Sequence, residues 1–396
     1  MDKLVFSFND VPVILIIFQS LLFAILLLIV KVGKRQANIF LAFFLLAIGL
    51  DALDAMIYWS PSIKHVYLSD HIHIFYCLKF SVYLAAPTLY FYVKSLLYAD
   101  YVFSRKDVVH FIPLFLFPVM IAALYASLGE EGRELGITQF GLLYGNPVYQ
   151  VHLWVRNILY VGYGVACLIL LLRYKEELKQ RYSNIEKIDM FWLMMLVGGF
   201  LMIWVWVFIS YLITLFSSSM WLGNVIGISG NIFNAIFVNA LVVYSMAHVT
   251  IGYVLQPVED KTEVKEPESI DPGIMDKLNH IMLERELFLD PDLTLEQLAE
   301  ITGISARKIS SAINRTGKQN FFDYINNFRV KKAVDILTRS FAQNVSKSSA
   351  KLSMLDVMAD AGFNSKSTFY RAFKKMTNMT PTEYQDQAAR AAKPAP

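Results

Sequence analysis

The chain has little that would support disulfide, metal-centre or enzyme chemistry. Cysteine occurs only twice in 396 residues, at Cys77 and Cys167, each inside an apolar run. We interpret both as buried apolar thiols, because two such residues support neither a disulfide framework nor a cysteine-based zinc site. We find no HExxH motif, nucleophile elbow, phosphate-binding loop or suitably placed carboxylate pair. We therefore expect no enzyme, no cofactor and no bound metal.

Charged residues are also scarce, at 17%, whereas hydrophobic residues make up 56% of the chain. Together with a mean hydropathy of +0.44, these values exceed those of ordinary soluble domains. The excess lies before residue 256, and the remainder resembles a soluble domain. The net charge of +3 therefore averages two dissimilar parts and says little about either.

Seven apolar stretches are each long enough to cross about 30 Å of hydrocarbon as helices. We place them at residues 11–30, 38–59, 73–97, 109–127, 151–173, 190–215 and 223–246. The first has neither a basic leader nor a small-residue cleavage site, so we interpret it as a retained span rather than a signal peptide. We predict an all-α protein with a seven-helix transmembrane domain over residues 1–255.

Lysine and arginine gather in the connections after spans one, three and five. Eleven lie there, against three on the other side: Lys31, Lys34, Arg35, Lys94, Arg105, Lys106, Arg173, Lys175, Lys179, Arg181 and Lys187, against Lys3, Lys64 and Arg133. Basic loops stay in the cytoplasm. We therefore expect a multi-pass protein of the bacterial inner membrane, with its N-terminus outside and its C-terminal domain in the cytoplasm.

Residues 256–271 predict a solvated linker, since two prolines, six acidic residues and two basic ones cannot bury a core. At about 3.3 Å per residue this linker reaches roughly 50 Å at most. The domain that follows spans residues 272–388, and residues 389–396 predict a disordered tail.

A short pattern occurs twice in that domain: an apolar-periodic helix, a glycine, an apolar residue, a serine and a basic helix. The glycine and serine are Gly303 and Ser305 in the first copy and Gly362 and Ser365 in the second. Glycine permits a sharp turn, and we expect each serine to accept hydrogen bonds from the free N–H groups of the next helix. This order is typical of a helix-turn-helix.

Positive charge is concentrated where both basic helices lie. Residues 305–375 hold fourteen basic residues against four acidic ones, whereas residues 271–304 hold two against eight. Binding to DNA phosphates requires such a concentration. Between the copies, residues 321–337 predict one long helix that joins two small bundles. Such a connector can hold two recognition helices about 34 Å apart, one turn of DNA.

Residues 274–385 resemble the DNA-binding domain of the AraC/XylS family of bacterial transcription regulators. The most specific part comprises residues 362–365 and 369–375, Thr380, Pro381 and Tyr384. Asn378 replaces a turn glycine of the family, but asparagine also tolerates a left-handed conformation.

The resemblance implies contacts to double-stranded DNA from residues 306–315 and 366–375. The implied base contacts are Arg307, Ser310, Ser311, Lys366, Ser367, Thr368 and Arg371. The implied phosphate contacts are Lys308, Arg315, Lys374 and Lys375. Arginine is the residue best suited to bidentate contact with guanine. RNA polymerase and a second copy of the chain are further candidate partners.

Polar groups inside the predicted spans are candidates for function because they are costly in hydrocarbon. They are Asp51, Asp54, Lys79 and Arg156, with Asn231 and Asn234 among the amides of the last span. Asp51 and Asp54 share a helix face, where a basic side chain of another span could neutralise them. We favour a structural ion-pair network over the alternative, the lining of a ligand cavity.

A group of histidines lies on the predicted outer side. It comprises His65, His71 and His73, with Asp70 beside them and His152 at the start of the fifth span. Such a group could bind a metal or sense pH. We favour simple placement at headgroup depth, which is more common for interfacial histidines.

The sequence as a whole predicts a one-component transcription regulator in the lipid bilayer. In this interpretation the membrane half responds to an unknown small-molecule or membrane signal, and the linker passes the response to the DNA-binding domain. Two alternatives remain. The membrane half could be a small-molecule transporter or channel that carries a DNA-binding reporter, or it could be an inert anchor.

Overall fold

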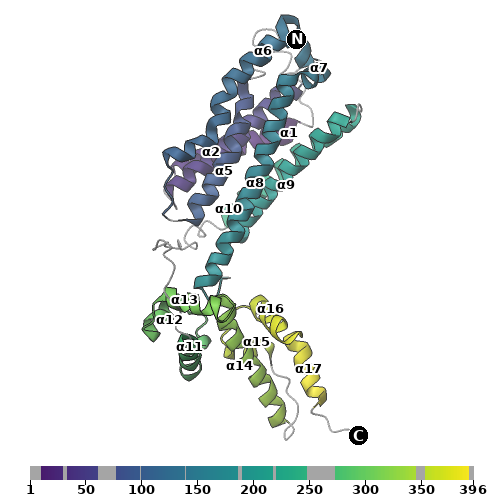
Figure 1. The fold of residues 1–396 in the computed structure, drawn as a ribbon. Helices are drawn as coiled ribbons and strands as arrows, with labels where there is room; N and C mark the ends of the chain where they lie inside the picture. The colour runs from purple at the N-terminus through teal and green to yellow at the C-terminus, as the bar shows by residue number, and fades with distance from the viewer. Residues whose placement is uncertain are drawn as a thin grey trace. The chain divides into compact units, whose positions relative to one another are not determined.

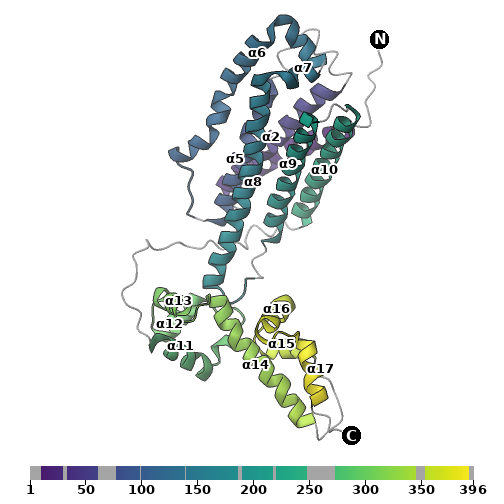
Figure 2. The same cartoon turned by 45° about the vertical axis from the view of Figure 1, so that its right-hand side comes forward.

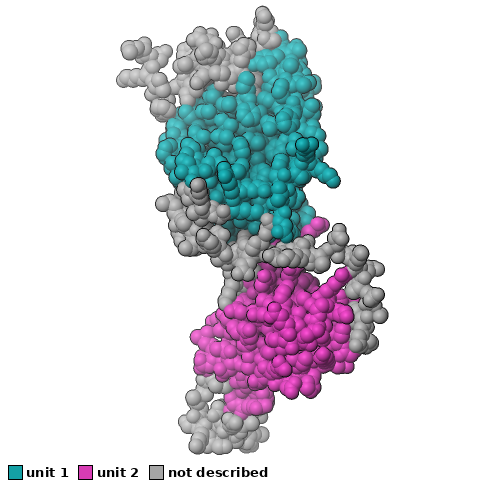
Figure 3. Space-filling view, turned by 90° about the vertical axis from the view of Figure 1, so that its left-hand side faces the viewer, with its two compact units in different colours: residues 1–172, 189–260 teal, residues 173–188, 261–396 magenta. Residues whose placement is uncertain are grey.

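The computed structural model describes most of the chain: residues 10–29, 34–60, 77–98, 100–138, 140–185, 190–216, 220–247, 273–344 and 353–391. These residues are mostly helical and contain no strand, which confirms the all-α class (Figure 1). The chain forms two compact units, residues 1–172 with 189–260 and residues 173–188 with 261–396 (Figure 3). The predicted linker, residues 256–271, lies outside the described residues.

The first unit contains the helices of the apolar half. They are α1 (Asp10–Ile29), α2 (Arg35–Trp59), η1 (Leu78–Phe80), α5 (Ser81–Leu97), η2 (Arg105–Phe111), α6 (Ile112–Thr138), α7 (Phe140–Gly145), α8 (Pro147–Arg181), α9 (Phe191–Phe216) and α10 (Met220–Ala247). Gly129, with φ 67°, interrupts α6. Helix α8 crosses the boundary between the units, so residues 173–181 belong to the second one.

Five segments among the described residues are long and apolar enough to cross a membrane. They lie at residues 10–29, 35–57, 105–129, 147–181 and 191–216. The third prediction, residues 73–97, is helical where it is described, but α5 has only 17 residues, or about 26 Å at 1.5 Å per residue. Helix α10 covers the seventh prediction. The count of seven spans is therefore not confirmed.

The first unit buries aromatic side chains and leaves apolar faces uncovered. Phe44 and Phe200 meet edge to face with ring centroids 4.7 Å apart, and the Gln19 amide on α1 donates to Asn239 on α10. Several outward side chains are more than half exposed: Phe18, Leu28, Phe115, Val119, Met202 and Phe216. Contiguous apolar surface is unfavourable in water and suits hydrocarbon. Cys167 is buried as predicted, but the same prediction is wrong for Cys77, which is exposed.

The second unit is built on one long helix. Its elements are α11 (Gly273–Glu284), η4 (Leu287–Leu289), α12 (Leu295–Thr302), α13 (Ala306–Arg315), α14 (Phe321–Asn344), α15 (Met354–Asp360), α16 (Lys366–Thr377) and α17 (Pro381–Ala391), together with the end of α8. Figure 2 shows α14 between α11–α13 on one side and α15–α17 on the other. The predicted connecting helix is therefore confirmed and continues to Asn344.

Helix α14 contributes to two separate hydrophobic cores. Its first half packs with α11, α12 and α13 through Phe321, Tyr324, Ile325 and Phe328. Its second half packs with α15 and α16 through Val330, Ala333 and Leu337. Since one helix supplies both cores, it couples the positions of the two helix-turn-helix motifs.

Candidate nucleic-acid interface

The first helix-turn-helix consists of α12 and α13. Thr294 and Gln297 form a capping box: the Gln297 N–H donates to Thr294 Oγ1 (3.1 Å), and the Thr294 N–H donates to Gln297 Oε1 (2.8 Å). Gly303 ends α12 in the left-handed conformation, with φ 67°. Ser305 precedes α13 but makes no side-chain capping hydrogen bond. The prediction that both serines cap is therefore wrong for Ser305.

The second helix-turn-helix consists of α15 and α16. Ser365 caps α16, as predicted, by accepting a hydrogen bond from the Thr368 N–H at 3.3 Å. Gly362 makes the turn with φ 83°. Asn378 ends α16 with φ 59°, which confirms the predicted left-handed asparagine.

The turn of the second motif also touches the first subdomain. A Cβ atom at Gly362 would lie 2.8 Å from both Leu289 Cα and Phe288 O, closer than real Cβ contacts. Glycine is therefore required at this turn for two reasons, the backbone conformation and the close approach of another backbone.

Helix α13 buries its apolar face, so its polar face points outward. Ile309, Ala312 and Ile313 are buried, so the basic residues lie on the opposite side of the helix. Arg307, Lys308 and Arg315 are exposed, whereas Ser310 and Ser311 are partly buried. The sequence interpretation missed Asn314, which is exposed and donates a hydrogen bond to Ser310 Oγ at 3.2 Å.

Helix α16 presents a similar basic face. Phe369 and Phe373 anchor it in the second core, and Lys366, Ser367, Arg371, Lys374 and Lys375 are exposed. Thr368, however, is only 4% exposed, so its side chain offers little surface to a base. Lys375 Nζ lies 2.9 Å from Asp323 Oδ2, and the lysine side chain is 68% exposed. Such a surface pair is weak and can yield to a phosphate.

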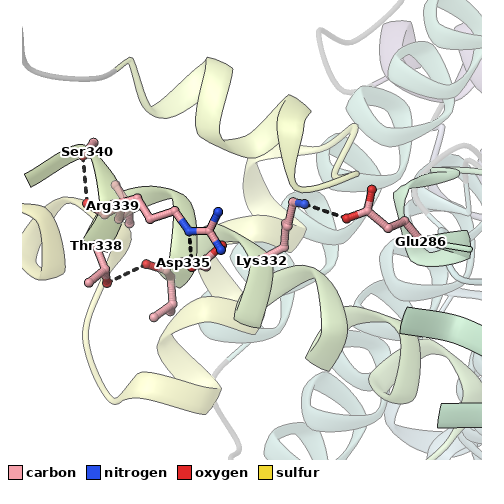
Figure 4. A network of polar contacts seen from close by, with 8 residues as sticks. Glu286, Lys332, Asp335, Thr338, Arg339 and Ser340 are labelled. Atoms are coloured by element: carbon pink, nitrogen blue, oxygen red, sulfur yellow. Dashed lines mark hydrogen bonds and ion pairs between the residues drawn. The ribbon is translucent and has the colours of Figure 1, made fainter. Parts of the chain in front are cut away.

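The connecting helix is tied to the turn after α11. Lys332 on α14 forms an ion pair with Glu286 (Figure 4). The distance from Lys332 Nζ to Glu286 Oε1 is 2.7 Å. Arg329, a residue that the sequence interpretation missed, donates to Phe288 O (2.7 Å) and Asp290 O (2.8 Å). An arginine inside an apolar-periodic helix was the available sequence signal, because a buried guanidinium requires several acceptors.

The structure pairs two of the polar residues that lie in the predicted spans. Lys79 Nζ lies 2.9 Å from Asp54 Oδ2, with side chains 11% and 12% exposed. Arg156 Nη2 donates to Asn157 Oδ1 at 3.5 Å. Among the described residues, the buried atoms Arg156 Nε and Asn234 Oδ1 have no hydrogen-bond partner. Asp51 and Asn231 are partly buried.

Of the outer histidine group, only His152 is among the described residues. Its Nδ1 lies 2.7 Å from the Tyr83 hydroxyl, and both side chains are buried. His65, Asp70, His71 and His73 lie outside the described residues. In the part of the chain that the structure describes, no group of three or more potential ligands could hold a metal ion.

Comparison with known proteins supports a helix-turn-helix domain in the second unit. Residues 298–387 match the family model of a helix-turn-helix domain, in agreement with the resemblance of residues 274–385 to the AraC/XylS DNA-binding domain. Uncharacterized HTH-type transcriptional regulators of Staphylococcus aureus strains COL, MSSA476 and N315 are 28% identical over 110 residues. The match covers 28% of this chain and 13% of each relative. No solved structure matches the chain significantly.

The match therefore supports a DNA-binding helix-turn-helix domain in the second unit. The five apolar segments, of which residues 147–181 extend into that unit, are long and apolar enough to cross a membrane.

Proposed function

We propose that the chain is a membrane-embedded one-component transcription regulator that binds specific duplex DNA. The main observation behind this proposal is that α13 and α16 both expose basic residues and both pack on α14. Two recognition helices held by one rigid helix can enter successive major grooves about 34 Å apart. A single chain would then bind two neighbouring half-sites.

The exposed side chains suggest a division of roles. We assign Arg307 and Arg371 to base edges, because a guanidinium can bond both acceptors of guanine. Lys308, Arg315 and Lys374 suit phosphates, which demand charge more than fixed geometry. Lys375 would exchange its pairing with Asp323 for a phosphate on DNA.

Two observations support a cytoplasmic position for the DNA-binding domain. Lys34 Nζ, just before α2, donates to Ser95 O and Tyr98 O at the end of α5, so two of the basic connections meet at one end of the first unit. The third, residues 173–188, belongs to the same compact unit as the DNA-binding domain. Both fit an inner-membrane protein whose basic loops and C-terminal domain face the cytoplasm.

Selection of DNA from a random-sequence pool tests the binding function. The full chain in lipid nanodiscs should enrich sequences with two half-sites about 10 bp apart, and a footprint should protect both. Enrichment of one half-site, or of no sequence, would contradict the proposal. In inside-out membrane vesicles, added protease should remove the C-terminal domain. Protection of that domain would contradict the proposed topology.

The role of the membrane half is tested separately. The partly buried pair of Asp54 and Lys79 is compatible with a sensor and with a transporter. Signal-dependent reporter expression without substrate uptake into vesicles would support sensing. Uptake that disappears in Asp54→Asn would support transport. Unchanged regulation after deletion of residues 1–255 would support an inert anchor.

A further inference from the structure

The segment that follows α8 is bound to the DNA-binding domain, more than a hundred residues away in the sequence. Ser183 is 1% exposed. Its N–H donates to Leu293 O at 3.2 Å, and its hydroxyl donates to Pro291 O at 3.4 Å. The neighbouring Tyr182 forms an isolated antiparallel bridge with Thr294. Residues 182–185 therefore lie along the loop that leads into α12.

Arg329 extends this contact to the connecting helix. Its guanidinium donates to the backbone oxygen of Ser183 (3.3 Å) and to the Ser183 hydroxyl (3.2 Å), in addition to its bonds to Phe288 O and Asp290 O. The side chain is 2% exposed. Burial lowers the pKa of Arg329 to about 10, so it stays charged at neutral pH and needs every acceptor. If the segment with Ser183 undocked, Arg329 Nη1 and Nη2 would each lose one acceptor. Unpaired N–H groups in a buried guanidinium reduce stability.

The loop at residues 287–294 meets both helix-turn-helix motifs. Thr294 is the N-cap of α12 in the first motif. The backbone of Leu289 is in close contact with Gly362, the turn of the second motif. Arg329 joins the loop to α14 between Phe328 of the first core and Val330 of the second. A change in this loop would therefore reach both recognition helices.

We propose that residues 182–185 are an intramolecular input element, which docks on the loop at residues 287–294 and holds α13 and α16 at the spacing that DNA requires. This inference rests on the proposed DNA-binding function. Helix α8 is continuous from Pro147 to Arg181 and contains a candidate membrane span. A shift or rotation of α8 therefore reaches the docked segment directly, because residues 182–185 follow the last turn of α8 without a break. Docked and undocked states supply the two conformations that coupling requires.

A disulfide tests the docking. Tyr182→Cys and Thr294→Cys, combined with Cys77→Ser and Cys167→Ser, place two thiols on bridge partners, whose Cβ atoms lie about 4.5–5.5 Å apart in an antiparallel pair. In membranes, mild oxidation should link most chains, as read by mass spectrometry of peptides. The control pairs Tyr182→Cys with Leu355→Cys, an exposed residue of α15. Equal cross-linking of both pairs would overturn the docking.

DNA affinity tests the coupling, with sequences selected by the full chain in nanodiscs. The disulfide-locked chain should bind at least as tightly as its reduced form. Ser183→Pro removes the N–H that Leu293 accepts, and should weaken binding at least about fivefold, the lower end of typical coupling. Ser183→Ala keeps that N–H and should lie between Ser183→Pro and wild type.

The outcomes separate this inference from the proposed function. Efficient cross-linking with equal affinity in the locked, reduced and Ser183→Pro forms would show that docking does not control the DNA-binding domain, and would overturn the coupling. If no form binds DNA, the proposed function fails and the inference fails with it, whatever the cross-link shows.

Discussion

Alanine at Gly362 should destabilise the second unit far more than alanine at Gly303. Both glycines have positive φ, +83° and +67°, and an L-residue in that conformation costs roughly 1–2 kcal/mol. A Cβ atom at Gly303 would meet nothing within 4 Å, whereas at Gly362 it would lie 2.8 Å from Leu289 Cα and Phe288 O. Backbone atoms cannot rotate away as a side chain can, so the loop itself must move.

The close approach should therefore add an overpacking cost of about 1–3 kcal/mol. We expect Gly303→Ala to lose about 1–2 kcal/mol of unfolding free energy and Gly362→Ala about 2–5 kcal/mol. Native-state hydrogen exchange of the buried amides of α14 and α16, in the full chain, measures both losses under identical conditions.

The difference between the two losses gives the cost of the close contact at Gly362, because the conformational penalty is common to both variants. Equal losses would refute the close approach of the second turn to the backbone at Leu289. A loss at Gly362 confined to α15 and α16 would show that the loop at residues 287–294 is not displaced.

Three further predictions concern single side chains. Arg371→Ala should cost about 1–3 kcal/mol of binding free energy on the preferred DNA site and relax base choice. Lys374→Ala should weaken binding to all DNA sequences alike and reduce the slope of log affinity against log salt concentration by about 1. Binding isotherms at several salt concentrations measure both effects. Ser365→Ala should lose about 1 kcal/mol and Ser305→Ala less than about half of that, by hydrogen exchange, because only Ser365 caps its helix. Asp54→Asn should cost about 1–3 kcal/mol and lower the melting temperature in detergent, because it removes the carboxylate of a partly buried ion pair.

The contradicting results are equally specific. A variant of Arg371 that keeps wild-type base preference would refute its contact with a base. Equal losses at Ser365 and Ser305 would contradict the difference in capping. An unchanged melting temperature for Asp54→Asn would show that the ion pair contributes no net stability.

The helix-turn-helix motifs were predictable because their signals are local. A turn glycine, a capping serine and apolar residues at helical spacing act within four or five residues of one another. The long α14 followed from the same periodicity, which continues through residues 321–337. Ser305 shows the limit of such patterns, since a serine at the N-cap position need not direct its hydroxyl to the helix.

The first unit was predictable as apolar and helical but not in detail. Apolar length predicted helices, yet α5 is shorter than its apolar stretch. Lys79 could have paired with either Asp51 or Asp54, which share a helix face, and only packing selects Asp54. Cys77 lies in an apolar run but is exposed, since hydropathy does not tell which face of a helix is covered.

The positions of the helices, their apolar faces and the concentration of positive charge could be predicted from local patterns, because these features depend on near neighbours and on composition. The contact of Arg329 with Ser183, 146 residues away, and that of Gly362 with the loop after α11 could not, because they depend on long-range packing. A guanidinium can bond to any carbonyl oxygen, and a glycine can approach any backbone. The packing of elements that are distant in the sequence decides which carbonyl oxygen the guanidinium bonds and which backbone the glycine approaches.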